Sequence, residues 1–246
     1  MAGSRGFGID VGGSGIKGGT VDLDTGTLVG KRRRIVTPQP STPEAVAAVA
    51  GQIVHHFGWH GRLGVTIPCV VKNGTAYSAA NVDPSWIGTD AVAVMAKEIG
   101  EPTLVLNDAD AAGIAEMHYG AGRDASGVVV LLTFGTGIGS AVFSDGELVP
   151  NTEFGHLELD GADAEDFAAA SVKDEQNLSW ADWTPRVSRY LQALEQVIWP
   201  DLIIVGGGVS KQADRWLPML DNRTTVVAAQ LRNDAGIVGA ALAAHA

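Results

Sequence analysis

Short apolar runs alternate along the first half of this chain with segments whose apolar positions follow helical spacing. The runs predict strands at 7–11, 16–22, 28–35, 63–70 and 104–106. Helices are predicted at 43–57, 89–99 and 109–119. The first of these helices begins after Thr42, a suitable N-cap that is followed by Pro43.

The second half repeats this plan. Strands are predicted at 128–133, 138–144, 147–149, 202–205 and 224–227. Helices are predicted at 162–173, 184–198, 209–219 and 235–245. Trp180 and Trp183 lie in a polar linker before one of these helices, where we expect them to be packing anchors.

A glycine-rich turn follows an apolar strand near the start of each half. The first turn lies in FGIDVGGSGIK at 7–17, and the second lies in VVVLLTFGTGIGSA at 128–141. Glycine allows the backbone N–H groups of a turn to approach an anion closely. In the first turn Ser14 adds a hydroxyl and Lys17 a positive charge, while Asp10 suits a metal ion or a metal-bound water. Either turn alone is also compatible with an ordinary hairpin, but two equivalent turns indicate a duplicated α/β phosphotransferase.

The composition excludes several classes of protein. With 46% hydrophobic and 18% charged residues, the 246-residue chain has enough apolar residues for one large domain or two smaller ones. The net charge of −11 disfavours a nucleic-acid binder. No apolar run is long enough for a membrane span and no apolar leader is present, so we expect a cytoplasmic protein. Cys69 is the single cysteine, which excludes a disulfide framework.

Asn107 and Asp108 follow a predicted strand and begin a predicted helix. Both residue types are favoured at a helix N-cap, and that structural role is one interpretation. The other interpretation depends on position, because α/β folds collect their ligands at the carboxyl ends of their strands. There, Asp108 is a candidate general base for an attacking hydroxyl.

Three further segments have candidate roles in binding. Glu153 and His156 are groups that suit sugar hydroxyls, although such a pair is also common on ordinary surfaces. Asn81 supplies an amide for a sugar hydroxyl, whereas Trp86 in the same loop is expected in the core. The glycines at 206–208 allow a base and ribose to approach the backbone, or they form only a tight turn.

One basic run occurs in this acidic chain, at 31–34. It is interpreted either as the solvated edge of a strand or as a docking patch for a polyanion. An acidic protein that binds a polyanion needs such a local concentration of positive charge.

Taken in order, these motifs resemble those of the sugar kinases of the ROK family, within the actin-like ATPase superfamily. The matching segments are 10–17, 107–108, 133–139, 153–156 and 206–208. The resemblance implies an α/β, two-lobed actin-like ATPase (ribonuclease H-like) fold with a duplicated mixed-sheet domain and an interdomain cleft. It also implies a small domain of residues 1–108 plus 236–246 and a large domain of residues 109–235.

The resemblance assigns roles to individual residues, with Asp108 as the general base. The implied sugar ligands are Asn81, Asn107, Asp108, Glu153, His156 and Glu165. The implied ligands of the donor phosphates are Asp10, Gly12, Gly13, Ser14, Gly15, Lys17, Thr133, Gly135, Thr136 and Gly137. The implied nucleotide ligands are Gly206, Gly207 and Gly208. Asp10 is also expected to bind Mg²⁺ through a water molecule.

One segment departs from the family pattern. ROK glucokinases usually follow the Glu-x-Gly-His segment with a cysteine-rich zinc site and a further sugar-binding glutamate. Residues 157–166 contain no cysteine, so we expect no zinc. Glu158 and Glu165 are both candidates for the missing glutamate, and the sequence does not decide between them.

Without a zinc site, and with the segments 37–40 and 233–241, the chain is most similar to the bacterial polyphosphate glucokinases of this family. That resemblance implies transfer of a phosphoryl group from inorganic polyphosphate, ATP or both to the 6-hydroxyl of glucose, in a homodimer. The alternative enzyme is an ATP-dependent kinase for another hexose, such as mannose or N-acetylmannosamine. A sugar-responsive binding protein without catalysis is the alternative from another class. Related repressors carry an N-terminal DNA-binding domain, for which a motif that begins at residue 7 leaves no room.

Overall fold

The structure is a computed structural model, and it describes residues 4–246. By their contacts these residues divide into two compact units. The first unit extends to Ala115 and also includes Asp234–Ala246, whereas the second is Glu116–Asn233. The predicted domain limits stay a prediction.

The first unit contains one main sheet. The strands of this unit are β1 (Arg5–Gly12), β2 (Gly15–Asp22), β3 (Thr27–Leu28), β4 (Arg33–Ile35), β5 (Leu63–Ile67), β6 (Val71–Lys72), β7 (Thr75–Ala76) and β8 (Thr103–Asn107). Strands β6 and β7 form a small separate hairpin. Its helices are α1 (Pro43–Phe57), η1 (Pro84–Trp86), α2 (Ala91–Ile99), the first part of α3 (Asp108–Tyr119) and α7 (Ala235–Ala243), which follows η5 (Arg232–Asp234). The strand order is β3-β2-β1-β5-β8, with β4 also paired to β2. Because β1, β5 and β8 are parallel, their carboxyl ends lie at one edge of the sheet.

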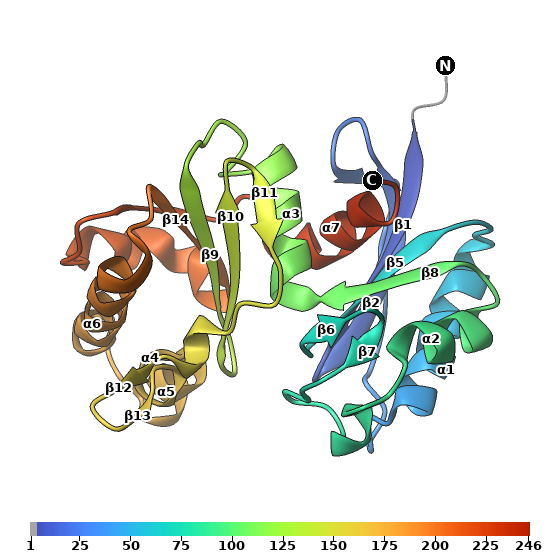
Figure 1. The fold of residues 1–246 in the computed structure, drawn as a ribbon, viewed down its shortest axis with the longest axis horizontal. Helices are drawn as coiled ribbons and strands as arrows, with labels where there is room; N and C mark the ends of the chain where they lie inside the picture. The colour runs from blue at the N-terminus through green and yellow to red at the C-terminus, as the bar shows by residue number, and fades with distance from the viewer. Residues whose placement is uncertain (1–3) are drawn as a thin grey trace. The chain divides into compact units, whose positions relative to one another are not determined.

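Helices cover both faces of this first sheet. In Figure 1, α1 and α2 lie on one face, and α7 lies against β1 and β5 on the other. The backbone of α7 is in close contact with the sheet at Gly8 and Gly64. A Cβ atom at these positions would overlap the carbonyl groups of Ile237 and Ala240. Glycine is therefore required at both positions by the close approach of α7.

The second unit is built around another mixed sheet. The strands of this unit are β9 (Val128–Phe134), β10 (Ile138–Ser144), β11 (Glu147–Val149), β12 (Glu158–Leu159), β13 (Ala162–Asp163), β14 (Leu202–Gly207) and β15 (Thr225–Ala228). Strands β12 and β13 form a small separate hairpin. Its helices are η2 (Phe154–His156), α4 (Glu165–Ala168), α5 (Ala170–Glu175), α6 (Trp180–Ile198), η3 (Gly208–Arg215) and η4 (Leu217–Met219). The strand order is β11-β10-β9-β14-β15, in which β9, β14 and β15 are parallel.

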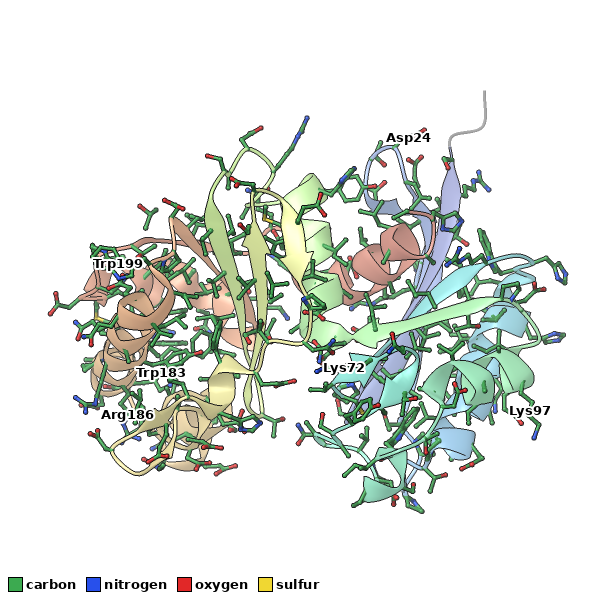
Figure 2. The ribbon with its side chains drawn as sticks, viewed as in Figure 1. Asp24, Lys72, Lys97, Trp183, Arg186 and Trp199 are labelled. Atoms are coloured by element: carbon green, nitrogen blue, oxygen red, sulfur yellow. The ribbon has the colours of Figure 1, made fainter. Side chains whose placement is uncertain are left out.

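Aromatic side chains form the centre of the second core. Figure 2 shows Trp183 between α6 and the rest of the second unit, and its side chain is fully buried. The rings of Trp183, Tyr190 and Trp216 meet that of Phe134 edge to face, at centroid distances of 5.8–6.4 Å. Trp86 is likewise fully buried in the first unit, where it donates to the carbonyl of Ser41. The predictions that Trp86 and Trp183 are core residues are confirmed.

Several predicted elements are wrong in detail. The strand at 28–35 is divided into β3 and β4, and Trp180 and Trp183 lie in the first turns of α6 rather than in a linker. The helix at 162–173 is replaced by β13, α4 and α5. It is interrupted at Ala169, where the backbone is extended and the indole of Trp183 donates to the carbonyls of Ala168 and Ala169.

The helix at 209–219 is replaced by two 3₁₀ helices, η3 and η4. Here the indole of Trp216 donates to the carbonyl of Val209, and Pro218 lies inside η4. In both segments an indole N–H thus bonds to carbonyls that a continuous helix would use. Within residues 4–246, no helix combines the length and apolar character that a membrane crossing requires.

Candidate active site

The first glycine turn joins β1 to β2 through Gly13 and Ser14, which are exposed. Two side chains engage carbonyl oxygens of this turn. The Thr37 hydroxyl donates to Gly12 O, and Arg34 Nη2 donates to Ser14 O at 2.7 Å. Among residues 4–246, none accepts a hydrogen bond from the N–H of Gly13 or Ser14. The turn therefore has engaged carbonyls, whose oxygens already accept hydrogen bonds, and available amides, whose N–H groups are free to donate. This is the arrangement that binds an anion.

A row of polar side chains crosses the sheet next to this turn. Strand register places Lys17 opposite Asp10 on one side and opposite Arg34 on the other. Lys17 Nζ lies 2.7 Å from Asp10 Oδ2, and the Thr66 hydroxyl donates to Asp10 Oδ1 at 3.2 Å. Both oxygens of Asp10 thus have partners, and its side chain is 16% exposed.

The structure confirms that Asn107 is an N-cap. Its Oδ1 accepts from the N–H groups of Ala109 at 2.8 Å and Asp110 at 3.1 Å, and its Nδ2 donates to Cys69 O at 3.2 Å. The side chain is only 7% exposed. Its role as a sugar ligand stays a prediction, and one amide hydrogen remains for that purpose.

Asp108 is the first residue of α3 and is half-buried. Its Oδ1 accepts from the N–H of Ala109 at 2.9 Å. The N-terminus of a helix favours a negative charge, so this position stabilises the carboxylate form of the side chain. A carboxylate in this place is the kind of group that a general base requires.

The residues of the first unit gather at one edge of its sheet. Asp10 pairs in register with Thr66, and Thr66 pairs with Leu106 near the end of β8. Two strand spacings separate Asp10 from the end of β8, or about 10 Å. Asn81 is close to the turn, since a Cβ atom at Gly13 would lie 3.3 Å from its carbonyl oxygen.

The second glycine turn joins β9 to β10 through residues 135–137. The N–H and hydroxyl of Ser171 donate to Gly135 O at 3.0 Å and to Thr136 O at 2.7 Å. Gly137 O accepts from the N–H of Gly135 at 2.9 Å. In the described part of the chain no group accepts from the N–H of Thr136 or Gly137. All three carbonyls are engaged and two amides remain available, as in the first turn.

Glu153, His156 and Glu165 form a cluster beside the second turn. Glu165 Oε2 accepts from the N–H of Ile138 at 2.9 Å, and Glu165 Oε1 lies 3.9 Å from His156 Nδ1. A Cβ atom at Gly155 would overlap Ile138 O and would lie 3.0 Å from Glu165 Oε2. Glycine at 155 therefore lets η2 lie against the base of the turn. Glu158 is exposed on β12 and has no such contact among the described residues.

The ionisation of this cluster is perturbed. The hydrogen bond of His156 Nδ1 to Asp163 Oδ2, at 2.8 Å, is the main cause that raises the pKa of His156; burial opposes it, and the nearby Glu165, Asp163 and Glu153 carboxylates add to it. Burial raises the pKa of Glu153, the His156 ring opposes this shift, and Glu165 adds to it. Because the carboxylate of Asp163 accepts from Nδ1, His156 presents Nε2 to a ligand.

The three glycines at 206–208 lie beside the second turn. Gly206 pairs with Thr133 and Gly207 with Phe134 across β14 and β9. Gly207 has a φ of 81°, and a Cβ atom there would overlap the Phe134 carbonyl. The second unit thus brings together the predicted second phosphate motif, the sugar motif and the nucleotide motif.

Residues 6–177 match the model of the ROK family. The chain is 60% identical to the polyphosphate glucokinase of Mycobacterium tuberculosis (strain CDC 1551 / Oshkosh), over 98% of this chain and 92% of that protein. This chain belongs to the ROK family. The predicted membership and the predicted α/β class with a duplicated mixed sheet are confirmed.

Two solved structures resemble this one closely. The crystal structure of the inorganic polyphosphate/ATP-glucomannokinase from Arthrobacter sp. strain KM has a TM-score of 0.95 and 49% identity, covering 98% of each chain. The ROK family glucokinase from Streptomyces griseus, solved with glucose and AMPPNP, has a TM-score of 0.81 and 24% identity, covering 98% of this chain and 99% of that one. At that identity the likeness concerns the fold alone.

The described residues offer few donors for a metal ion. Within residues 4–246, no group of three or more His, Cys, Asp or Glu side chains is arranged to hold a metal ion. Mg²⁺ commonly keeps several waters and binds one or two carboxylates together with substrate phosphates. Asp10, a carboxylate beside the first turn, fits that pattern when a phosphate supplies further oxygens.

Some residues that shape the site in this ROK chain have no signal in the sequence. Thr37 supports the first turn from 25 residues away, and Ser171 supports the second turn from 35 residues away. Asp163 supports His156 from seven residues away, across the small hairpin. Only the three-dimensional contacts show these roles. The basic run at 31–34 does have a signal, but its three arginines contact different groups: Arg32 contacts Asp234, Arg33 contacts His56 and Arg34 contacts Ser14 O.

Proposed function

We propose that this ROK chain transfers a phosphoryl group from inorganic polyphosphate or ATP to the 6-hydroxyl of glucose. One observation carries the proposal: each unit has a glycine turn with engaged carbonyls and available amides, and Asp108 lies at the same sheet edge as the first turn. The M. tuberculosis relative is a polyphosphate glucokinase and the Arthrobacter relative uses polyphosphate and ATP, as their names state. Their identity to this chain supports the same activity here.

In the proposed reaction the turns bind the phosphates of the donor. The N–H groups of Gly13 and Ser14 in the first turn, and of Thr136 and Gly137 in the second, donate to phosphate oxygens. The hydroxyls of Ser14, Thr133 and Thr136 are within the same segments and add donors. Phosphoryl transfer depends mostly on positioning and on charge stabilisation, and fixed amides provide both without reorganisation.

Asp108 accepts the proton of the 6-hydroxyl as the sugar oxygen attacks phosphorus. The new O–P bond forms, the bond to the leaving phosphate breaks, and the proton remains on the Asp108 carboxyl. The helix N-terminus at Asp108 favours a negative charge at this position. A general base of this kind contributes about 10²–10⁴ in rate.

Glu153, His156 and Glu165 orient the sugar. Each hydroxyl of glucose both donates and accepts, so carboxylates and an imidazole pair with it well. His156 Nε2 faces the ligand because Asp163 engages Nδ1. We propose that Glu165 rather than Glu158 is the further sugar-binding glutamate, since it alone contacts His156 and the second turn.

Asp10 would hold Mg²⁺ through water, together with oxygens of the donor. When bound, the ion neutralises charge on the transferring group. The remaining role of Asp10 in the chain is to fix Lys17, which lies 2.7 Å from its carboxylate. The homodimer and the cytoplasmic location stay predictions.

Removal of the Asp108 carboxylate tests the proposed base. Asp108→Asn should lower kcat by about 10²–10⁴, because the amide cannot accept the proton, while glucose still binds. Asp90→Asn is a matched control, since Asp90 caps α2 in the same unit and has no role in the reaction. The measurements are glucose 6-phosphate formation and equilibrium glucose binding. If Asp108→Asn keeps more than about a tenth of the wild-type rate, the assignment of the base is wrong.

Mannose is a second candidate acceptor, because the Arthrobacter relative is a glucomannokinase. A coupled assay with each pair of donor and acceptor separates these alternatives. We expect phosphorylation of glucose with polyphosphate. Activity with ATP alone would contradict the polyphosphate part of the proposal, and absence of any sugar phosphorylation would favour a binding protein without catalysis.

A further inference from the structure

We propose that the guanidinium of Arg34 is a direct ligand of the donor phosphates at the first turn. This inference rests on the proposed function and names a specific cation for its polyanionic donor. Of the basic run at 31–34, only Arg34 is proposed to bind phosphate.

The position of Arg34 is fixed by the turn itself. Its Nη2 donates to Ser14 O at 2.7 Å, and strand register places it opposite Lys17. A Cβ atom at Gly15 would overlap the guanidinium, so the glycine at 15 provides the space that this group occupies. The planar cation thus lies against the Ser14 carbonyl and beside Gly15, within the turn that carries the available amides.

The charge of Arg34 is not compensated, whereas its neighbours are engaged elsewhere. Arg32 pairs with Asp234, and Arg33 Nη1 lies 3.1 Å from His56 Nδ1 on α1. Lys17 pairs with Asp10 at 2.7 Å. Among residues 4–246, no carboxylate lies within ion-pair distance of Arg34. Arg34 is therefore the side chain that gives the first turn a net positive charge.

The chemistry of this group matches a chain of phosphates. A guanidinium has five N–H donors in a rigid fork, and one contact to Ser14 O leaves donors for a phosphate. Bidentate bonds between Arg and phosphate are shorter and stronger than neutral hydrogen bonds. The chain has a net charge of −11, which repels a polyanion, so a local cation at the binding turn is needed.

Binding measurements without glucose test this role apart from catalysis. Arg34→Gln should weaken the binding of long-chain polyphosphate by roughly 10-fold or more, since it removes charge-assisted bonds. Arg33→Gln is the matched control, because it removes the same charge from the adjacent residue, which faces His56. It should bind polyphosphate within about twofold of wild type, with the small difference reflecting screened long-range charge. Titration calorimetry at two salt concentrations is the measurement.

The salt dependence separates a ligand from a mere support of the turn. If Arg34 contacts phosphate, Arg34→Gln lowers the slope of binding against salt as well as the affinity. Wild-type affinity and slope in Arg34→Gln would overturn the inference, even if the phosphorylation of glucose became slower. Wild-type protein that neither binds polyphosphate nor uses it would refute the proposed function together with this inference. Wild-type protein that does both, with Arg34→Gln unchanged, would refute this inference alone.

Discussion

The two glycine turns of this ROK chain have the same backbone arrangement but different supports. In the first turn, the side chains of Thr37 and Arg34 engage the carbonyls. In the second turn, Ser171 does so with both its backbone N–H and its hydroxyl, and the turn adds a bond of its own. The charges at the two turns also differ, since the first has Arg34 beside it and the second has the carboxylate of Glu165.

Under the proposed function, this difference predicts that the two turns contribute unequally to binding of the donor. A turn with a cation suits the part of the donor where negative charge is greatest. A turn next to a carboxylate is less suited to a dense anion, but it places Glu165 where a sugar hydroxyl can be bound. The two halves thus share the same glycine-turn backbone, which lies beside a positive charge in the first unit and beside a negative charge in the second.

Among changes to the surroundings of the two turns, the largest effect is expected from the carboxylate at the second turn. Glu165→Gln should lower kcat/KM for glucose by about 10-fold or more, because bonds to a charged acceptor are replaced by weaker ones. Polyphosphate binding should change little, since the cation at the first turn is retained. Glu158→Gln, at an exposed position on β12, is the control and should have nearly wild-type kinetics. The opposite ranking of the two variants would assign the sugar contact to Glu158.

A smaller effect is expected when one support of each turn is removed. Thr37→Val leaves Gly12 O without its buried donor and should lower the free energy of unfolding by about 1–3 kcal/mol. Ser171→Ala should cost only about 0.5–1.5 kcal/mol, because the backbone bond to Gly135 O remains. Thermal unfolding measures both, at about 2–4 °C for each kcal/mol in a chain of this size. Thr25→Val, at an exposed position, is the control. Equal losses from Thr37→Val and Ser171→Ala would contradict the difference in supports.

The smallest effect concerns pH at the second turn. The pKa of His156 is raised above its ordinary value of 6.5, so the protonated ring is favoured in the folded state. Its contribution to stability is complete below the unfolded pKa, about 6.5, and is lost as the pH rises through the raised pKa. Because the side chain is 57% exposed, solvent screening should keep this contribution under about 1 kcal/mol.

Titration of the His156 ring by NMR checks this expectation. Asp163→Asn should lower the pKa toward 6.5, since the carboxylate that accepts from Nδ1 is its main cause. His156→Gln should remove the corresponding step from the profile of stability against pH. An unchanged pKa in Asp163→Asn would show that the hydrogen bond between these side chains does not govern the ionisation.

The sequence predicts local features of this molecule better than distant ones. The glycine turns, the cap at Asn107 and the core position of Trp86 follow from residue types and short spacings, and the structure contains them. The broken helix at 162–173 could not be predicted, because the indole that takes its carbonyls comes from Trp183 on α6. The choice between Glu158 and Glu165 depends likewise on where η2 and the second turn meet. Contacts between remote segments therefore decide what short patterns leave open.

The position of α7 on the first sheet has a consequence for biosynthesis. This helix is in backbone contact with Gly8 and Gly64, yet it is translated after the entire second unit. While the ribosome makes the second unit, one face of β1 and β5 lacks the helix that covers it. The second unit is a single segment of the chain and can fold as it emerges. The first unit is complete only after α7 has been synthesised. A ribosome-stalled nascent chain that ends before residue 234 should therefore expose apolar surface of the first unit to chaperones.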